Sequence, residues 1–303
     1  MTEIASIPVL DLSSTTDTEL LAGLRSSSCV LLTGLDTFGP DLAAMMASAR
    51  TFFALPEHEK LAVRWGGTGP WQGWQPVYDS GPTASPMERF EVALPDPSGF
   101  NSTAEWAATF RQWPVYPEDM METWARYYRT MRELASHLVV LIAEALSLPA
   151  SDLPAWTAGQ HSNLCVNHYL AQVEPPRPET IRSGAHTDIG GITLLWAENN
   201  PGGGLEAQLG PGGTWVPVVF PPNALLLQAG DLLHWWSGGV IPANNHRVVN
   251  PSRDPDVEQT DRYSVVFFHH PNLDASVAAD SATTVSAREH VLARQRGSYS
   301  LKE

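Results

Sequence analysis

The chain has 303 residues, of which 43% are hydrophobic and 17% are charged, a composition typical of a globular protein and unlike that of a disordered one. Its formal net charge of −15 would repel phosphate backbones and anionic lipid, so we expect neither nucleic acid nor a membrane surface as a partner. Two cysteines provide no disulfide framework, and no secretory signal or apolar run of about 20 residues is visible, which favours a cytoplasmic protein.

The start of the chain predicts two strands and a helix. Residues 7–12 (IPVLDL) have the apolar character of an edge strand, and residues 29–34 (CVLLTG) that of a buried strand closed by glycine. Pro40 suits the first position of a helix, and the apolar residues that follow keep helical spacing to about Leu55. This part of the chain is therefore expected to mix helices with short strands.

An irregular stretch and a long helix follow. Residues 64–117 contain many glycine and proline turns. Trp74 lies in this stretch, where a large aromatic side chain lines a ligand pocket or anchors the loop by packing; we take it as a candidate substrate contact and leave both interpretations open. Residues 120–148 carry the longest helical pattern of the chain, and Pro149 ends it.

The second half of the chain predicts short strands separated by Gly, Pro and Asn turns. Seven such strands are expected, at residues 164–170, 191–197, 205–209, 214–219, 224–228, 246–249 and 264–269. Strands of this length and spacing favour a jelly roll or a barrel.

The order of these elements predicts an α+β fold, mainly β, in which a double-stranded β-helix (jelly roll) is supported by N-terminal and long helices. We expect one domain over residues 1–303. Within it, residues 1–150 form a helical and mixed region packed on the core, residues 160–275 form the jelly-roll core, and residues 276–303 form a C-terminal helix. No pattern in the sequence indicates an oligomeric state.

His186 and Asp188 stand two residues apart, next to a predicted strand. In an extended chain, side chains at positions i and i+2 point to the same side, so an imidazole and a carboxylate converge on one ion. A His-x-Asp pair alone is weak evidence, because it occurs by chance in many chains. The rest of the sequence has to supply a third ligand.

That third ligand is His246, which begins a later predicted strand, and Arg262-Tyr263-Ser264 begins another. Two histidines and one carboxylate form a facial triad, which leaves coordination positions of iron(II) open. Open positions are needed where an organic oxo-acid binds the metal through two atoms and dioxygen takes a third. Arg262 supplies a planar, two-pronged cation for the distant carboxylate of such an acid, and Ser264 adds a hydroxyl donor.

The order His-x-Asp, histidine, Arg-x-Ser resembles that of the isopenicillin N synthase-like family of iron(II)- and 2-oxoglutarate-dependent dioxygenases. Residues 7–12 are similar to the start of that family's N-terminal region, and residues 52–56 (FFALP) to the exit of its first long helix. Residues 228–231 (QAGD) are similar to its glycine-aspartate turn. The likeness covers most of the chain, and the shared order of these pieces is more specific than any one of them.

The resemblance implies a set of roles. His186, Asp188 and His246 would be catalytic and hold Fe(II), and Arg262 and Ser264 would bind the far carboxylate of 2-oxoglutarate. Asn167 and Tyr169 match the family's Asn-x-Tyr and would also face 2-oxoglutarate. Apart from the resemblance, Phe268 is a candidate substrate contact from its position six residues beyond Arg262, and a packing role for this aromatic side chain stays open as well. The family's tyrosine-tyrosine-proline is here His168-Tyr169-Leu170, a departure beside the expected cosubstrate site.

The implied reaction consumes 2-oxoglutarate and O2, releases succinate and CO2, and oxidises a C–H bond of a small molecule. The outcome is hydroxylation, or desaturation, cyclisation or epoxidation, in specialised metabolism or on an amino-acid-like substrate. A pocketed β core suits a small molecule better than a macromolecule.

Three alternatives stay open at this point. The closest is an isopenicillin N synthase-like iron oxidase that does not require 2-oxoglutarate, since Arg-x-Ser can hold another anion; Asn167 and Tyr169 favour 2-oxoglutarate. A jelly-roll binding module without catalysis is a second alternative. A zinc hydrolase is a third, because two histidines and an aspartate also suit zinc, although Arg-x-Ser would then lack a purpose.

Overall fold

Two β-sheets form the centre of the computed structural model, which describes residues 6–35, 38–66, 72–76, 87–172, 181–199, 204–251, 254, 259–278 and 284–299. The larger sheet has eight strands, in the order β1 (Val9–Asp11), β2 (Cys29–Thr33), β10 (Leu225–Ala229), β7 (Ile192–Ala197), β12 (Arg262–His269), β5 (Asn163–Tyr169), β4 (Met87–Val92) and β3 (Gly73–Gln75). The smaller sheet has four, in the order β6 (Ser183–His186), β11 (His246–Val249), β8 (Gly204–Gln208) and β9 (Trp215–Pro217). A separate pair is formed by β13 (Ser276–Ala278) and β14 (Thr284–Ser286).

The helices lie around these sheets. They are α1 (Asp17–Ser27), α2 (Phe38–Phe53), α3 (Glu57–Lys60), α4 (Thr103–Ala107), α5 (Met120–Ala145), α6 (Leu153–Thr157), α7 (Asp231–Trp236) and α8 (Ala287–Tyr299), with short 3-10 helices at Leu61–Val63 and Pro97–Gly99. At the start of α1, Thr16 and Glu19 form a capping box, in which each side chain accepts a hydrogen bond from the other residue's backbone N–H.

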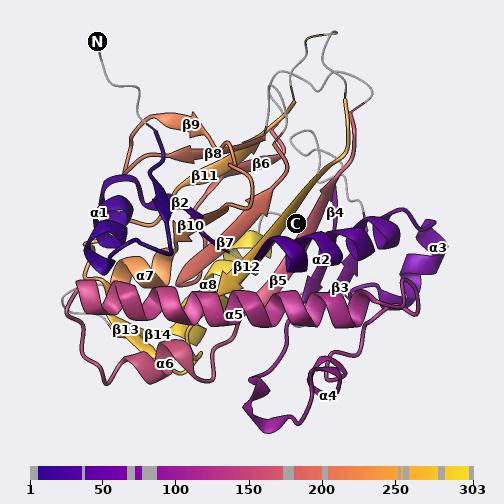
Figure 1. The fold of residues 1–303 in the computed structure, drawn as a ribbon, viewed down its shortest axis with the longest axis horizontal. Helices are drawn as coiled ribbons and strands as arrows, with labels where there is room; N and C mark the ends of the chain where they lie inside the picture. The colour runs from indigo at the N-terminus through magenta and orange to yellow at the C-terminus, as the bar shows by residue number, and fades with distance from the viewer. Residues whose placement is uncertain are drawn as a thin grey trace.

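The long helix α5 and its neighbour α2 cover one face of the larger sheet (Figure 1). The apolar stripe of α5 is fully buried and includes Trp124, Met131 and Leu138. On the sheet side it meets Phe90 of β4, whose ring contacts Trp124 edge to face at 5.4 Å. The apolar cluster between these helices and the sheet is the larger of the two in the described residues, and each large side chain buried in it contributes roughly 1.5–3 kcal/mol.

A second, smaller apolar cluster fills the space between the two sheets. Because side chains alternate along a strand, Cys165 and Tyr169 of β5 face this space, whereas Leu164 and Val166 face the helices. From the smaller sheet, Leu205 and other β8 and β11 residues close it from the opposite side. The interior of the β core is thus bounded by one face of each sheet.

The predicted fold class is confirmed: the chain is mainly β at its centre, with supporting helices outside. All seven strands expected after residue 160 are present within two residues of their predicted ends. Five strands were not predicted: β3 and β4, inside the stretch expected to be irregular, and β6, β13 and β14. The expected helix over 276–303 covers Ala287–Tyr299 and follows β13 and β14. β2 lies between β1 and β10 in the sheet, so the first part of the chain contributes to the same sheet as the rest.

Trp74 lies on the helix-facing side of the larger sheet, in a buried polar network, and not in the space between the sheets. Its side chain is 2% exposed, and its indole N–H donates to the Glu88 carboxylate at 2.7 Å. Lys60 Nζ donates to the same carboxylate at 2.8 Å, and His168 Nδ1 lies 2.9 Å from it. Burial raises the pKa of Glu88, but the hydrogen bonds from His168, Lys60 and Trp74 outweigh burial and hold this pKa below its ordinary value.

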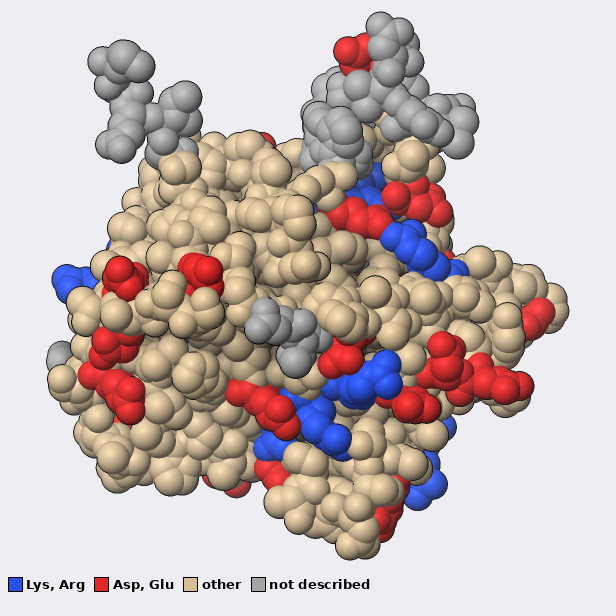
Figure 2. Space-filling model, viewed as in Figure 1, with Lys and Arg blue, Asp and Glu red and all other residues tan. Residues whose placement is uncertain are grey.

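Acidic and basic side chains are interspersed on the face shown in Figure 2. Two of the pairs on the helices and loops are Arg126 with Asp41, at 2.9 Å, and Arg50 with Glu198. Of the helices within the described ranges, none combines the length and the apolar character that a bilayer crossing requires. Cys29 and Cys165 are both buried and form no disulfide.

Replacing Glu88 tests the buried network. Glu88→Ala removes the partner of three buried donors and leaves the Lys60 ammonium uncompensated, so we expect a loss of about 3–5 kcal/mol in the free energy of unfolding. Urea unfolding followed by tryptophan fluorescence measures it. The exposed Glu57 on α3 provides the control, because Glu57→Ala should change the stability by less than about 0.5 kcal/mol. If Glu88→Ala and Glu57→Ala have the same free energy of unfolding, the buried network around Glu88 does not stabilise the fold.

Candidate metal centre

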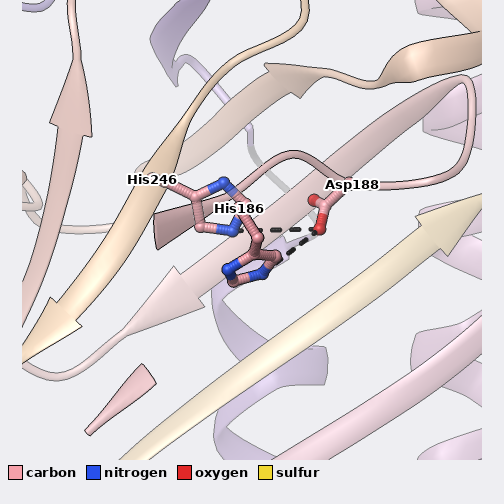
Figure 3. A group of neighbouring side chains, drawn as sticks. All are labelled: His186, Asp188 and His246. Atoms are coloured by element: carbon pink, nitrogen blue, oxygen red, sulfur yellow. Dashed lines mark ion pairs between the residues drawn. The ribbon is translucent and has the colours of Figure 1, made fainter. Parts of the chain in front are cut away.

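Two strands and a turn bring His186, Asp188 and His246 together. His186 ends β6 and lies directly opposite His246 at the start of β11, while Asp188 follows in the turn after β6. One ligand atom from each residue lies within 4.8 Å of the others. Figure 3 shows both imidazoles directed at one carboxylate oxygen: Asp188 Oδ1 is 3.9 Å from His186 Nε2 and 3.8 Å from His246 Nε2.

Backbone carbonyls determine which nitrogen of each imidazole faces the centre of the group. His186 Nδ1 lies 2.7 Å from the Gly184 carbonyl oxygen, and His246 Nδ1 lies 3.3 Å from that of Asn244. Because a carbonyl only accepts, each Nδ1 donates its N–H, and each Nε2 is the nitrogen directed at the centre, where the neutral ring presents a lone pair. Burial, with a smaller contribution from His186, lowers the pKa of His246 and outweighs the raising effect of Asp188, which favours the neutral form of this imidazole.

The carboxylate of Asp188 is held from behind. Thr193, the second residue of β7, donates its hydroxyl to Asp188 Oδ2 at 2.5 Å, which leaves Oδ1 for the imidazoles. The Asp231 amide donates to the Asp188 carbonyl at 2.9 Å. The chain approaches so closely here that a Cβ on Gly230 would overlap the Gly190 carbonyl oxygen. Glycine is therefore required in the predicted glycine-aspartate turn.

Helix α8 supports the same turn from outside. Arg294 donates to the Thr187 carbonyl at 2.9 Å, and its Nε lies 3.3 Å from the Asp231 carboxylate. His290 approaches that carboxylate at 3.2 Å. The C-terminal helix thus restrains the residue that lies between His186 and Asp188 in the sequence.

The donor set of this group fits iron(II). Two imidazole nitrogens and one carboxylate oxygen form the 2-His-1-carboxylate arrangement of non-haem Fe(II) oxygenases, and the ordering of each ligand by a second hydrogen bond is typical of metal sites. Asp188 and His246 are buried, whereas the His186 side chain is 44% exposed. The group is therefore open to the surroundings on the side of His186.

The expected cosubstrate residues are also brought together, at the start of β12 and the end of β5. Arg262 pairs with Tyr169 and Ser264 with Asn167 in the register of the sheet. Asn167 Nδ2 donates to Ser264 Oγ at 3.2 Å, and the Arg262 guanidinium carbon lies 5.3 Å from the centre of the Tyr169 ring. All four side chains are buried.

The guanidinium of Arg262 retains hydrogen-bonding capacity. Its Nε donates to the Glu198 carbonyl at 3.2 Å, while its buried Nη1 has no partner among the described residues. Burial lowers the pKa of Arg262, and the Tyr169 and Glu198 side chains act in the opposite direction. A buried cationic donor without an acceptor is costly, so this position favours an anionic ligand.

Of the two candidate substrate contacts, only Phe268 lies near the triad. Phe268 packs in the cluster between the sheets and pairs with Thr193, the residue that holds Asp188. Trp74 instead faces the helices and donates to Glu88, which agrees with the packing interpretation that the sequence left open. The physical reason is that Trp74 belongs to a strand, β3, whose alternation turns its side chain away from the interior.

The sequence did not single out several polar residues whose side chains face the space between the two sheets. Arg89 lies directly opposite Asn167, and Glu91 directly opposite Cys165, so both face the space between the sheets. Asn163 Nδ2 donates to Glu91 at 2.5 Å, and Gln75 approaches it at 3.5 Å. The alternating positions of Arg89 and Glu91 were the available signal, but charged residues in a buried strand hide the usual apolar pattern. Thr193 and Arg182 were missed as well.

Comparison with known proteins agrees with this geometry. Residues 161–271 match the model of the 2OG-Fe(II) oxygenase superfamily. The 2-oxoglutarate-dependent dioxygenase citB of Monascus ruber is 30% identical over 290 residues, covering 86% of this chain and 82% of that protein. The chain belongs to the 2OG-Fe(II) oxygenase superfamily. Homoarginine-6-hydroxylase 2-ODD-233 of Oryza sativa subsp. japonica is 29% identical over 232 residues, covering 75% and 68% of the two chains.

A solved structure from Neurospora crassa shares the whole fold. This full-length protein, crystallised in complex with alpha-KG and 5-formyluracil, is 25% identical and superposes with a TM-score of 0.78, covering 95% of each chain. As a member of the superfamily the present protein is an oxidoreductase that uses Fe(II), 2-oxoglutarate and O2, and the predicted family is confirmed. The alternative of an iron oxidase without 2-oxoglutarate is not favoured by these relatives.

The hydroxyl of Thr193 provides a test of how the group is supported. Thr193→Val removes the donor to Asp188 with little change of shape, so we expect the dissociation constant for Fe(II) to rise by roughly ten- to a hundredfold. Anaerobic metal titration measures it. Thr130→Val is the control, since Thr130 donates to the Asp41 carboxylate on a distant helix surface and should leave metal affinity unchanged. Equal Fe(II) affinity of Thr193→Val and Thr130→Val would show that the Thr193 hydroxyl does not support Asp188 as a metal ligand.

Glu91 provides a pH test. Burial raises its pKa from 4.5 to about 7, against the lowering effects of Arg89, Asn163 and Gln75. Between these two values the folded protein binds the proton more tightly than the unfolded chain, so stability falls as pH rises through this window. Glu91→Gln, which imitates the protonated form, should gain up to about 3 kcal/mol relative to the unaltered protein between pH 4.5 and 8.

Urea unfolding at each pH measures the gain, and the exposed Glu144 on α5 supplies the matched control. Glu144→Gln, the same substitution at an exposed position, should change the free energy of unfolding by less than about 0.5 kcal/mol. A pH-independent difference for Glu91→Gln would refute the buried titration.

Proposed function

We propose that His186, Asp188 and His246 hold Fe(II), and that Arg262, Ser264, Asn167 and Tyr169 bind the far carboxylate of 2-oxoglutarate, in an enzyme that oxidises a C–H bond of a small molecule. The observation that carries this proposal is the convergence of three metal-ligand atoms within 4.8 Å, in the same β core as a buried, incompletely partnered arginine.

Each ligand residue is prepared for its role. The two imidazoles donate Nδ1–H to backbone carbonyls, which orients both Nε2 atoms toward the centre where a cation would bind. Asp188 is held by the Thr193 hydroxyl, which limits its movement. When bound, Fe(II) with 2-oxoglutarate and O2 supplies the oxidising power that breaks the C–H bond, while 2-oxoglutarate is converted to succinate and CO2.

Arg262 and Ser264 would orient the cosubstrate. The unpartnered Nη1 of Arg262 and the Ser264 hydroxyl lie on the interior face of β12, in a water-poor environment where an ion pair is stronger than at the surface. Tyr169 closes the site over the guanidinium. Binding the far carboxylate there would leave the oxo-acid end of 2-oxoglutarate free to approach the triad.

A small molecule with polar groups suits the remaining interior surface. Phe268 offers an apolar face beside the residue that supports Asp188, and Arg89 and Glu91 add charged groups on the same side of the sheet. The relatives agree with this class: one is named a homoarginine hydroxylase, and the Neurospora crassa structure contains 5-formyluracil. We therefore propose hydroxylation as the basic reaction, with desaturation or cyclisation as its variants.

Removing His186 tests the proposal. Its side chain is 44% exposed, so His186→Ala should fold normally while Fe(II) binding and succinate formation from 2-oxoglutarate fall to background. Anaerobic iron titration and succinate assays, with and without a panel of small polar substrates, measure both. His58→Ala, on the exposed surface of α3, should match the unaltered protein.

Retained succinate formation in His186→Ala would refute the triad. Substrate turnover without succinate in the unaltered protein would support the oxidase instead, and failure to take up iron would support a binding module.

A further inference from the structure

A second arginine lies beside the proposed cosubstrate site. Arg182, four residues before His186, is 5% exposed. Its guanidinium carbon lies 5.3 Å from the centre of the Tyr169 ring, the same distance as that of Arg262. The two guanidiniums therefore share one aromatic neighbour, and that ring belongs to the cluster between the sheets.

Most of the hydrogen-bonding capacity of Arg182 is unused. Nη2 donates to the Leu170 carbonyl at 3.3 Å, whereas the buried Nε and Nη1 have no acceptor in the described part of the chain. Nη1 of Arg262 is in the same condition. Buried donors are nearly always paired in folded proteins, and donors on a cation especially so, which means that an acceptor is expected to enter between them.

The charge balance points to an anion. Burial, followed by the charge of Arg262, lowers the pKa of Arg182 to about 10, while Tyr169 and Asp261 act in the opposite direction. Asp261 is only a partial counter-ion, because its carboxylate is about half exposed and already accepts from His168 and the Ala171 amide. Two like charges in a buried site are stabilised by a ligand of opposite charge.

Strand β6 connects Arg182 to the metal group. Its pairing with β11 is irregular between Ser183 and His186. Gly184, within this irregularity, is exposed, and a Cβ added to it would meet no described atom within 4 Å. The strand that connects the second arginine to the metal group is therefore open to solvent at this point.

We propose that Arg182 is a second cationic contact for the far carboxylate of 2-oxoglutarate, which it would grip together with Arg262. This assignment rests on the proposed function. A carboxylate has two oxygens with about four acceptor positions, enough for both guanidiniums and the Ser264 hydroxyl. The site would then be selective for an oxo-acid with a second carboxylate.

The test compares binding of two oxo-acids of equal length. Arg182→Met should weaken 2-oxoglutarate binding by roughly ten- to a hundredfold, as expected for loss of a charged hydrogen bond, and should leave binding of 2-oxopentanoate, which lacks the far carboxylate, unchanged. Anaerobic calorimetry on iron-loaded protein measures both. Arg182→Lys, which keeps the charge and loses the planar fork, should fall between.

A matched control separates binding from structure. Arg132 is also buried, but it pairs with Asp96 outside the space between the sheets. Arg132→Met should lower the melting temperature of the ligand-free protein and leave its affinity for 2-oxoglutarate unchanged. Arg182→Met should show the reverse: a ligand-free melting temperature as high as that of the unaltered protein, because a like-charge repulsion is relieved, and a smaller rise on adding 2-oxoglutarate.

Two results would overturn the assignment alone: 2-oxoglutarate affinity of Arg182→Met within about twofold of the unaltered protein, or equal weakening for both oxo-acids. If the unaltered protein binds no 2-oxoglutarate, the proposed function fails and this assignment fails with it.

Discussion

The register between β6 and β11 is the constraint on which the site depends. It sets His186 directly opposite His246, at the spacing where side chains of neighbouring strands touch. The two imidazole rings are 4.3 Å apart, and Asp188 completes the group from the adjoining turn. A slip of one residue would turn one imidazole to the outer face of the small sheet. Packing of Leu205 and Val248 between the sheets opposes such a slip, so the apolar core enforces the metal geometry.

The side chains of β5 alternate between the interior of the β core and the helix-facing side, and the polar groups on the two sides have different partners. Asn167 and Tyr169 face the interior, beside Ser264 and Arg262. His168, between them in sequence, faces the helices, where it approaches the Glu88 carboxylate and stacks on Tyr263 at 4.5 Å. The departure from the family's tyrosine at this position therefore alters the helix-facing core and leaves the interior unchanged. The Glu88 carboxylate that His168 approaches also accepts from Lys60 of α3, so this hydrogen-bond network connects the helical layer to the sheet.

Charge is distributed unevenly inside the β core. Arginines 182 and 262 lie around Tyr169 at one end of β5, and Glu91 lies opposite Cys165, further along the same strand. The metal-ligand histidines lie on the smaller sheet, across the interior from these charged side chains, and Thr193 of β7 holds Asp188 by a hydrogen bond. In a buried space such charges act over several ångströms with little screening. They would orient a dianionic cosubstrate and a polar substrate differently before either reaches the metal.

The sequence by itself determined seven strands of the second half and the pairing of His186 with Asp188, because alternation and an i, i+2 spacing are local properties; His246 followed from the order of the motifs. Through its resemblance to a family the sequence also implied that Arg262, Ser264, Asn167 and Tyr169 face one ligand, whereas the pairing of their strands came from the structure. The sequence did not determine β4, where Glu88, Arg89 and Glu91 interrupt the apolar pattern, or the side to which Trp74 turns. The position of β4 and the orientation of Trp74 were decided by tertiary structure alone. A buried charged side chain is tolerated only where hydrogen-bond or ion-pair partners from distant parts of the chain surround it. The register of the sheet determines which side chains become those partners.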